Sequence, residues 1–143
     1  MREVMAQPNT VPISMHAPFL SNLNVQANVA LVLEYQEYWF NGLAQQKALE
    51  QLTRLELGHK ATSHHTKLTH AELFYAQLAR ASMLSDREIV IDRPFGFVPF
   101  ESSVEFILSA MARLEITHER VRIIDLLAIK NRYKDEVCRI EEW

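Results

Sequence analysis

Residues 25–57 read VQANVALVLEYQEYWFNGLAQQKALEQLTRLEL, and this apolar stretch with a single glycine decides the fold that we expect. At about 100° per residue, its first half places one apolar set on one side of a helix: Val25, Val29, Val32, Trp39 and Leu43. Beyond Gly42 the apolar set moves to nearly the opposite side: Ala44, Ala48, Leu52 and Leu55. We therefore expect a break or kink at Asn41–Gly42, where glycine costs about 1 kcal/mol of helix preference. The alternative is a continuous helix whose halves face different partners, such as its own core and another subunit.

Three further segments carry helical signals. Thr69 followed by Glu72 forms the pattern of a capping box, which predicts a helix over 69–84. A second box of the same kind predicts a helix over 102–114, where the apolar residues fall at helical spacing. A continuous apolar stripe predicts a last helix over 117–143.

Residues 88–100 interrupt the helical pattern. The segment Glu88–Asp92 is rich in β-branched residues and predicts a strand. Arg93–Gly96 is a turn signal, and Phe97–Phe100 predicts a return strand that Pro99 limits to a sheet edge. A lone hairpin is marginally stable, so we expect it to lie on the helices or to pair with another chain.

The expected fold is mostly α, a helical bundle of four to five helices with one short β-hairpin or strand near residues 88–100. We expect a single helical domain over 25–143, because 143 residues is a usual length for one domain. Three prolines within residues 1–24 predict an irregular N-terminal arm. That arm is either a disordered tail or an extended segment that packs on its own domain or on a partner.

Composition excludes several classes of function. With three glycines, the chain lacks nucleotide-binding loops and the serine nucleophile elbow, and we expect no catalysis. One of them, Gly58, is placed to end a helix. The net charge of −3 is unlike that of proteins that bind polyanions. The single cysteine, Cys138, fits a reducing compartment. We find no membrane-spanning apolar run and no secretory signal pattern, so we expect a cytoplasmic protein.

Two Glu-x-x-His pairs, Glu56–His59 and Glu115–His118, have the spacing that di-iron bundles use. Each pair straddles an expected helix boundary, whereas such sites need pairs within helices that face inward. A metal-binding helical protein, possibly a ferritin-like di-iron oxidoreductase, is therefore the alternative hypothesis. The histidines of the loop 59–70 lie in a polar, aperiodic segment, and we expect them to be solvated. We expect neither a cofactor nor a metal.

The recognition signal in this sequence is aromatic. Four aromatic residues crowd one and a half turns of the first helix, and three phenylalanines surround the expected hairpin turn. Aromatic side chains contribute disproportionately to interface energy. For the first group, the alternative is the centre of the monomer core. The candidate protein-interface residues are Tyr35, Tyr38, Trp39, Phe40, Phe95, Phe97 and Phe100.

The sequence thus predicts a non-catalytic protein-binding module, such as an adaptor, inhibitor, assembly factor or small subunit of a complex, acting through apolar and aromatic helical surfaces. We expect a protein partner, with homo-oligomerisation as an alternative, and no membrane contact. A nucleic-acid-associated regulator is the second alternative. Basic residues of 120–139 are interleaved with acidic ones, however, which indicates a salt-bridged face rather than a phosphate track.

Overall fold

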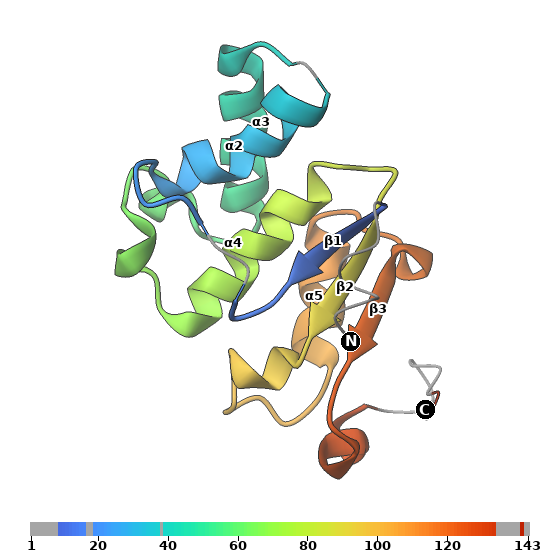
Figure 1. Cartoon of the computed structure of the whole chain (residues 1–143). Coiled ribbons are helices and arrows are strands. Elements are labelled where there is room, and N and C mark those ends of the chain that lie inside the picture. The colour runs from blue at the N-terminus through green and yellow to red at the C-terminus, as the bar shows by residue number, and fades with distance from the viewer. Residues whose placement is uncertain (1–8, 17–18, 38, 134–140, 142–143) are drawn as a thin grey trace.

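The computed structural model describes residues 9–16, 19–37, 39–133 and 141. These residues are mostly helical and also form a small parallel sheet of three strands (Figure 1). The α-helices are α2 (Val25–Gln36), α3 (Asn41–Arg54), α4 (His70–Ser82) and α5 (Glu105–Arg113). The strands are β1 (Thr10–Ile13), β2 (Glu88–Asp92) and β3 (Val121–Ile124). Short 3₁₀ segments are η1 (Gly58–Lys60), η2 (His65–Lys67), η3 (Pro94–Gly96), η4 (His118–Arg120) and η5 (Leu127–Arg132).

The sheet has the order β1-β2-β3, and both pairs of neighbours are parallel. Parallel neighbours need a crossover connection, and the chain supplies α2, α3 and α4 for the first crossover and α5 for the second. The register sets Ile13 beside Ile91 and Ile91 beside Ile123. These isoleucines share the sheet face that joins the hydrophobic core, because side chains two apart in a strand point to the same side.

The expected β-hairpin near residues 88–100 is wrong. β2 pairs with β1 and β3, and the chain leaves it through Arg93 and the turn η3 rather than returning as a strand. Ile89, Val90 and Ile91 are all fully buried, which is typical of a central strand covered on both faces. Such a strand lacks the alternation of apolar and polar residues, so its own sequence does not show which strands lie beside it.

The flanking strands come from segments for which we expected other structure. Residues 10–13, within the expected irregular arm, form β1. The expected helix over 117–143 is wrong for its described part, because Val121–Ile124 is β3 and Leu127–Arg132 is 3₁₀. The β-branched residues of β3 pack beside β2, and this pairing outweighs the helical spacing that we followed. The predicted bundle is not confirmed, since a sheet forms part of the core.

The stretch 25–57 does break, but slightly earlier in the chain than its glycine suggested. α2 ends at Gln36 and α3 begins at Asn41, so Gly42 lies in the first turn of α3. The carbonyl of Leu33 accepts hydrogen bonds from the backbone N–H groups of Glu37 and Trp39, both at 3.1 Å, which closes α2. The two helices then pack against each other, and each buries its own apolar side.

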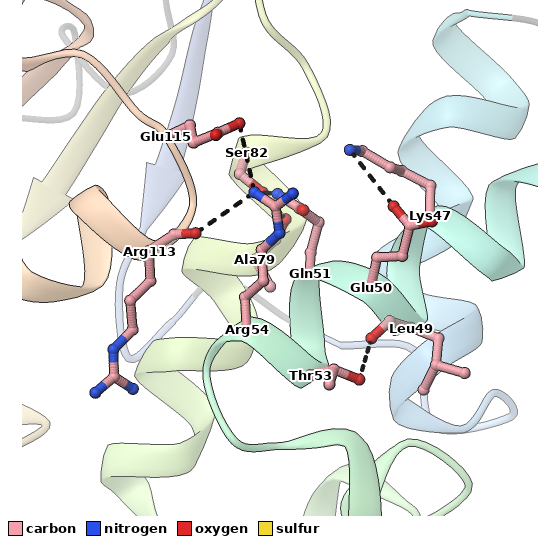
Figure 2. Close-up of polar contacts among 10 residues, drawn as sticks. All are labelled: Lys47, Leu49, Glu50, Gln51, Thr53, Arg54, Ala79, Ser82, Arg113 and Glu115. Carbon is pink, nitrogen blue, oxygen red and sulfur yellow. Dashed lines mark hydrogen bonds and ion pairs between the residues drawn. The ribbon is translucent and has the colours of Figure 1, made fainter.

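Polar contacts anchor α3 to α4 and to the end of α5 (Figure 2). Gln51 Nε2 donates to Ser82 Oγ at 2.8 Å, and Ser82 Oγ donates in turn to the carbonyl of Ala79 at 2.6 Å. Arg54 Nη1 lies 3.5 Å from the carbonyl oxygen of Arg113 and 3.5 Å from Glu115 Oε2. The helix hairpin α2–α3 is therefore fixed to the rest of the molecule at the C-terminal part of α3.

Both α3 and α5 end with a glutamate in the left-handed backbone region, Glu56 at φ 62° and Glu115 at φ 59°. Two hydrogen bonds close α3: Leu57 N–H to the Leu52 carbonyl at 2.8 Å and Glu56 N–H to the Thr53 carbonyl at 3.0 Å. These are the bonds of a Schellman motif. Gly58 does not end the helix as we expected, because Glu56 already does. Among the described residues, no helix is long and apolar enough to cross a membrane.

Candidate functional site

The connection between α2 and α3 is exposed because both helices turn their apolar sides towards the core. At the start of α2, the side chain of Asn28 is buried and satisfied by the backbone of residues 20–24, from which its Oδ1 accepts the Leu20 N–H at 2.6 Å. α2 buries Val25, Val29 and Leu33, and α3 buries Ala44, Ala48 and Leu52. With those sides used for the core, the residues at the turn are left on the outer side of the hairpin.

Four large apolar side chains are exposed at this turn. Tyr35 and Phe40 are 74% and 81% exposed, Trp39 is 42% exposed, and Leu43 in the first turn of α3 is also exposed. We call these four residues the turn surface. Exposed apolar residues that lie together often indicate an interaction site, whereas single exposed apolar residues are normal on a protein surface.

A hydrogen bond across the turn holds this surface in place. Asn41 Nδ2 donates to Glu34 Oε1 at 2.8 Å, so the first residue of α3 is tied to the last turn of α2. Residues 34–46 contain the acidic residues Glu34 and Glu37 and neither lysine nor arginine. The next basic residue, Lys47, lies one turn after Leu43 and pairs with Glu50 at 3.8 Å, so acidic side chains predominate beside the aromatic rings of the turn surface.

The structure divides the seven candidate interface residues. Tyr35, Trp39 and Phe40 lie on the turn surface, and Tyr38 lies outside the described residues. Phe100 is exposed, but it follows η3, a part of the chain at the opposite end of the molecule from the α2–α3 turn (Figure 1).

Phe95 and Phe97 are buried and belong to the monomer core, which corrects their place among the candidate interface residues. The ring of Phe97 lies 5.4 Å from that of Phe74 on α4, and the ring of Phe95 lies 5.5 Å from that of Phe106 on α5. The small domain buries this aromatic group by itself, because α4 and α5 bring two more phenylalanines to it.

The Glu-x-x-His pairs do not come together as metal ligands. Glu56 and Glu115 both lie just beyond helix ends, and Glu115 faces Arg54. Within the part of the chain that the structure describes, we find no group of three His, Cys, Asp or Glu side chains able to hold a metal ion.

The loop histidines have structural contacts. His64 Nε2 lies 2.8 Å from the carbonyl oxygen of Ser21, and His64 Nδ1 lies 2.8 Å from Thr66 Oγ1. The ring of His65 meets that of Phe19 edge-on, 6.4 Å away. The same loop accepts the first backbone N–H groups of α2 through Ser63 and Ala61, at 2.9 Å each. This loop therefore fixes the start of α2 and, through it, the direction of the helix hairpin.

Sequence reasoning missed a polar row at the carboxyl edge of the sheet, which is where α/β folds place ligands. Ser14 follows β1, Asp92 ends β2 and Asp125 follows β3. Each is engaged: Ser14 backbone with Gln77, Asp92 with Arg93 at 2.9 and 3.2 Å, and Asp125 with the Tyr133 hydroxyl at 2.6 Å. An isoleucine precedes each of the three, a repeated signal that becomes readable only when all three strands are known.

Arg93 is the most unusual residue of this row. It follows β2 directly, and its backbone has a φ of 48°, in the left-handed region. Its guanidinium donates two hydrogen bonds to the buried carboxylate of Asp92. That pairing, with a smaller effect of Asp125, raises the pKa of Arg93 above its usual value. The row therefore consists of residues that are hydrogen-bonded within the fold, and the turn surface is the stronger candidate site.

No family model matches this chain and no curated protein matches it, so the turn surface stands on the chemistry of its own residues.

Proposed function

We propose that this chain is a non-catalytic protein-binding module that docks a partner protein on the turn surface. The observation that carries the proposal is the exposure of Tyr35, Trp39 and Phe40 together on a turn whose backbone is held by hydrogen bonds. Aromatic residues are enriched among interface residues that each contribute about 2 kcal/mol or more to binding. Their rings have few rotatable bonds, so ordering them on a partner costs little entropy.

The border of the turn surface suggests the chemistry of the partner. Glu34 and Glu37 are not offset by a basic residue within 34–46. An acidic border favours a partner whose apolar pocket is flanked by lysine or arginine, because complementary charge speeds association and rejects acidic competitors. The same border disfavours nucleic acid, whose phosphates it would repel.

The di-iron alternative is less well supported by the positions of its ligands. Such a centre needs both Glu-x-x-His pairs within helices and facing inward. Glu56 and Glu115 instead occupy left-handed positions after the helices have ended.

Photocrosslinking at the turn surface tests the proposal. A photoreactive phenylalanine analogue in place of Phe40 should give one dominant protein adduct in native lysate, which mass spectrometry identifies. Phe100 is the matched control, because it is the same residue type, 75% exposed against 81% for Phe40, and belongs to the other end of the molecule. Light scattering of the purified chain distinguishes a foreign partner from a second copy. Equal adducts from positions 40 and 100, or none from position 40, would contradict the proposal.

A further inference from the structure

A pocket of about 290 Å³ opens between the C-terminal end of α3, the middle of α4 and one side of α5. Its apolar lining comes from Leu55, Phe106 and Ala110, all of which are buried. This volume is close to the lower limit for small-molecule sites, about 300 Å³, and suits a molecule of amino-acid size.

Four polar side chains complete the lining: Glu56, Tyr75, Ser109 and Arg113. None of the four makes a side-chain hydrogen bond or ion pair with any residue that the structure describes. Tyr75 is half-buried, whereas Glu56, Ser109 and Arg113 are exposed. This partly open pocket therefore offers a carboxylate, a guanidinium and two hydroxyl groups without a side-chain partner among the described residues. A few polar groups around an apolar base are a common composition of a ligand site.

The repeated pattern Arg-Leu-Glu explains why this carboxylate and this guanidinium are unpaired. It occurs as Arg54-Leu55-Glu56 at the end of α3 and as Arg113-Leu114-Glu115 at the end of α5. Arg54 of the first copy pairs with Glu115 of the second, at 3.5 Å. Figure 2 shows Arg54 directed at Glu115 and at the carbonyl of Arg113, while the guanidinium of Arg113 points away from both. One arginine and one glutamate thus hold the helix ends together, and the other two line the pocket.

The backbone next to Glu56 strengthens the negative side of the pocket. Glu56 follows the C-terminal end of α3, where the helix dipole carries a partial negative charge that attracts cations. Tyr75 lies in a more apolar part: burial, and to a lesser degree the charge of Glu101, raise the pKa of its hydroxyl, while Arg113 acts in the opposite direction. At neutral pH this hydroxyl is protonated and can donate a hydrogen bond.

We propose that this pocket binds a free α-amino acid with an apolar side chain. The carboxylate of the ligand pairs with the guanidinium of Arg113 and the hydroxyls of Tyr75 and Ser109. Its ammonium group faces Glu56, and its side chain rests on the apolar base. A simple anion does not satisfy the site, because Glu56 repels it, and a simple cation leaves Arg113 unpaired.

L-Leucine is the probe, and amide chemical shifts of the full chain are the readout. A dissociation constant on the order of 1 mM is expected for a ligand of this size in a partly open pocket. L-Leucinamide lacks the carboxylate and N-acetyl-L-leucine lacks the ammonium group, so each should bind at least about tenfold more weakly. N-Acetyl-L-leucine also represents the C-terminus of a peptide, and tighter binding of it than of leucine would overturn the assignment to a free amino acid.

Variants place the ligand within the pocket. Glu56→Gln and Arg113→Gln should each weaken leucine binding about tenfold or more, since each removes one charge-assisted contact. Glu119→Gln is the control for Glu56, because Glu119 is an exposed glutamate of η4 that does not line the pocket, whereas Glu115 pairs with Arg54 next to Arg113. Arg122→Gln, whose partner Glu88 lies in the sheet, is the arginine control. Arg54 is unsuitable as a control, because it contacts the backbone of Arg113.

Two further controls distinguish a loss of leucine binding from unfolding and from an effect on the turn surface. Each variant should keep the dispersed spectrum of the folded chain, and Phe40→Ala should bind leucine as the wild type does. The proposal is overturned if leucine up to about 10 mM gives no saturable shifts at the pocket residues. It is equally overturned if the two pocket variants bind leucine as tightly as their controls do.

Discussion

The α2–α3 turn and the η3 turn both bring aromatic side chains to a place where a helix or strand has just ended, yet they differ in what covers those side chains. At η3, the rings of Phe95 and Phe97 meet those of Phe106 on α5 and Phe74 on α4. At the α2–α3 turn, Phe40 is 81% exposed. The sequences of the two turns are similarly aromatic, and only one of them has helices packed over it.

This difference assigns the two aromatic groups separate roles. Burying a ring removes apolar surface from water and stabilises the fold, at about 25 cal/mol for each Å² buried. An exposed ring leaves that free energy available to a partner. Substitutions in the first group should therefore alter stability, and substitutions in the second should alter binding.

The largest effect is expected for Phe97→Ala. Phe97 is 1% exposed, and its ring packs against Phe74, so truncation leaves a cavity in the core. The free energy of unfolding should fall by about 3–5 kcal/mol, measured by urea denaturation. Phe100→Ala, at an exposed position two residues after Val98, should change it by about 0.5 kcal/mol or less. A similar loss in both variants would remove the distinction between the turns.

A smaller effect, and one on binding alone, is expected for Phe40→Ala. Affinity for the partner identified by crosslinking should fall by about 2 kcal/mol, or about 30-fold, by calorimetry. The free energy of unfolding should stay within about 0.5 kcal/mol of the wild type, since the ring has little contact to lose. Unchanged affinity would contradict a role of Phe40 in binding, and a large loss of stability would show that its ring supports the fold as that of Phe97 does.

Thr69→Ala tests how far the cap of α4 stabilises the buried aromatic rings at η3, because α4 carries Phe74 and begins at the cap residue Thr69. The Thr69 hydroxyl accepts the Glu72 N–H at 3.1 Å, and Glu72 Oε1 accepts the Thr69 N–H at 2.9 Å. Loss of the cap should cost about 1 kcal/mol of unfolding free energy. Thr117→Ala is the control, because Thr117 precedes η4 without a side-chain cap bond. Equal losses in the two variants would contradict a specific role of the cap.

The smallest effect is a pH dependence from the same cap. The backbone N–H of Thr69 and, less strongly, Lys60 at 3.6 Å lower the pKa of Glu72 below its usual 4.5. A lowered pKa in the folded state stabilises the protein above pH 4.5, and this contribution disappears as the pH falls through the folded-state pKa. The stability difference between wild type and Glu72→Gln should thus shrink between neutral pH and about pH 3, by urea denaturation. A stability difference that stays constant over that range would contradict a lowered pKa of Glu72 in the folded state.

Part of the candidate site was predictable from the sequence. The sequence singled out Tyr35, Trp39 and Phe40 near an expected break, because their rings span too much of the helix circumference for one buried side. It left open whether they form an interface or the centre of the monomer core. The exclusion of Phe95 and Phe97 was not predictable, since the residues that cover them come from α4 and α5. The pocket could not be predicted either, because Glu56 and Arg113 are 57 positions apart and line the same pocket only through the packing of two helix ends.

By itself, the sequence determined the local features: the break in residues 25–57, the capped start of α4 at Thr69 and the strand Glu88–Asp92. Each depends on neighbours within about four residues, through helix spacing, caps and β-branched side chains. Only the tertiary structure decided that β2 pairs in parallel with strands near residues 10 and 121, because pairing partners so distant leave no mark on local periodicity. It also decided which aromatic turn is buried, because burial depends on the helices that the rest of the chain brings to it.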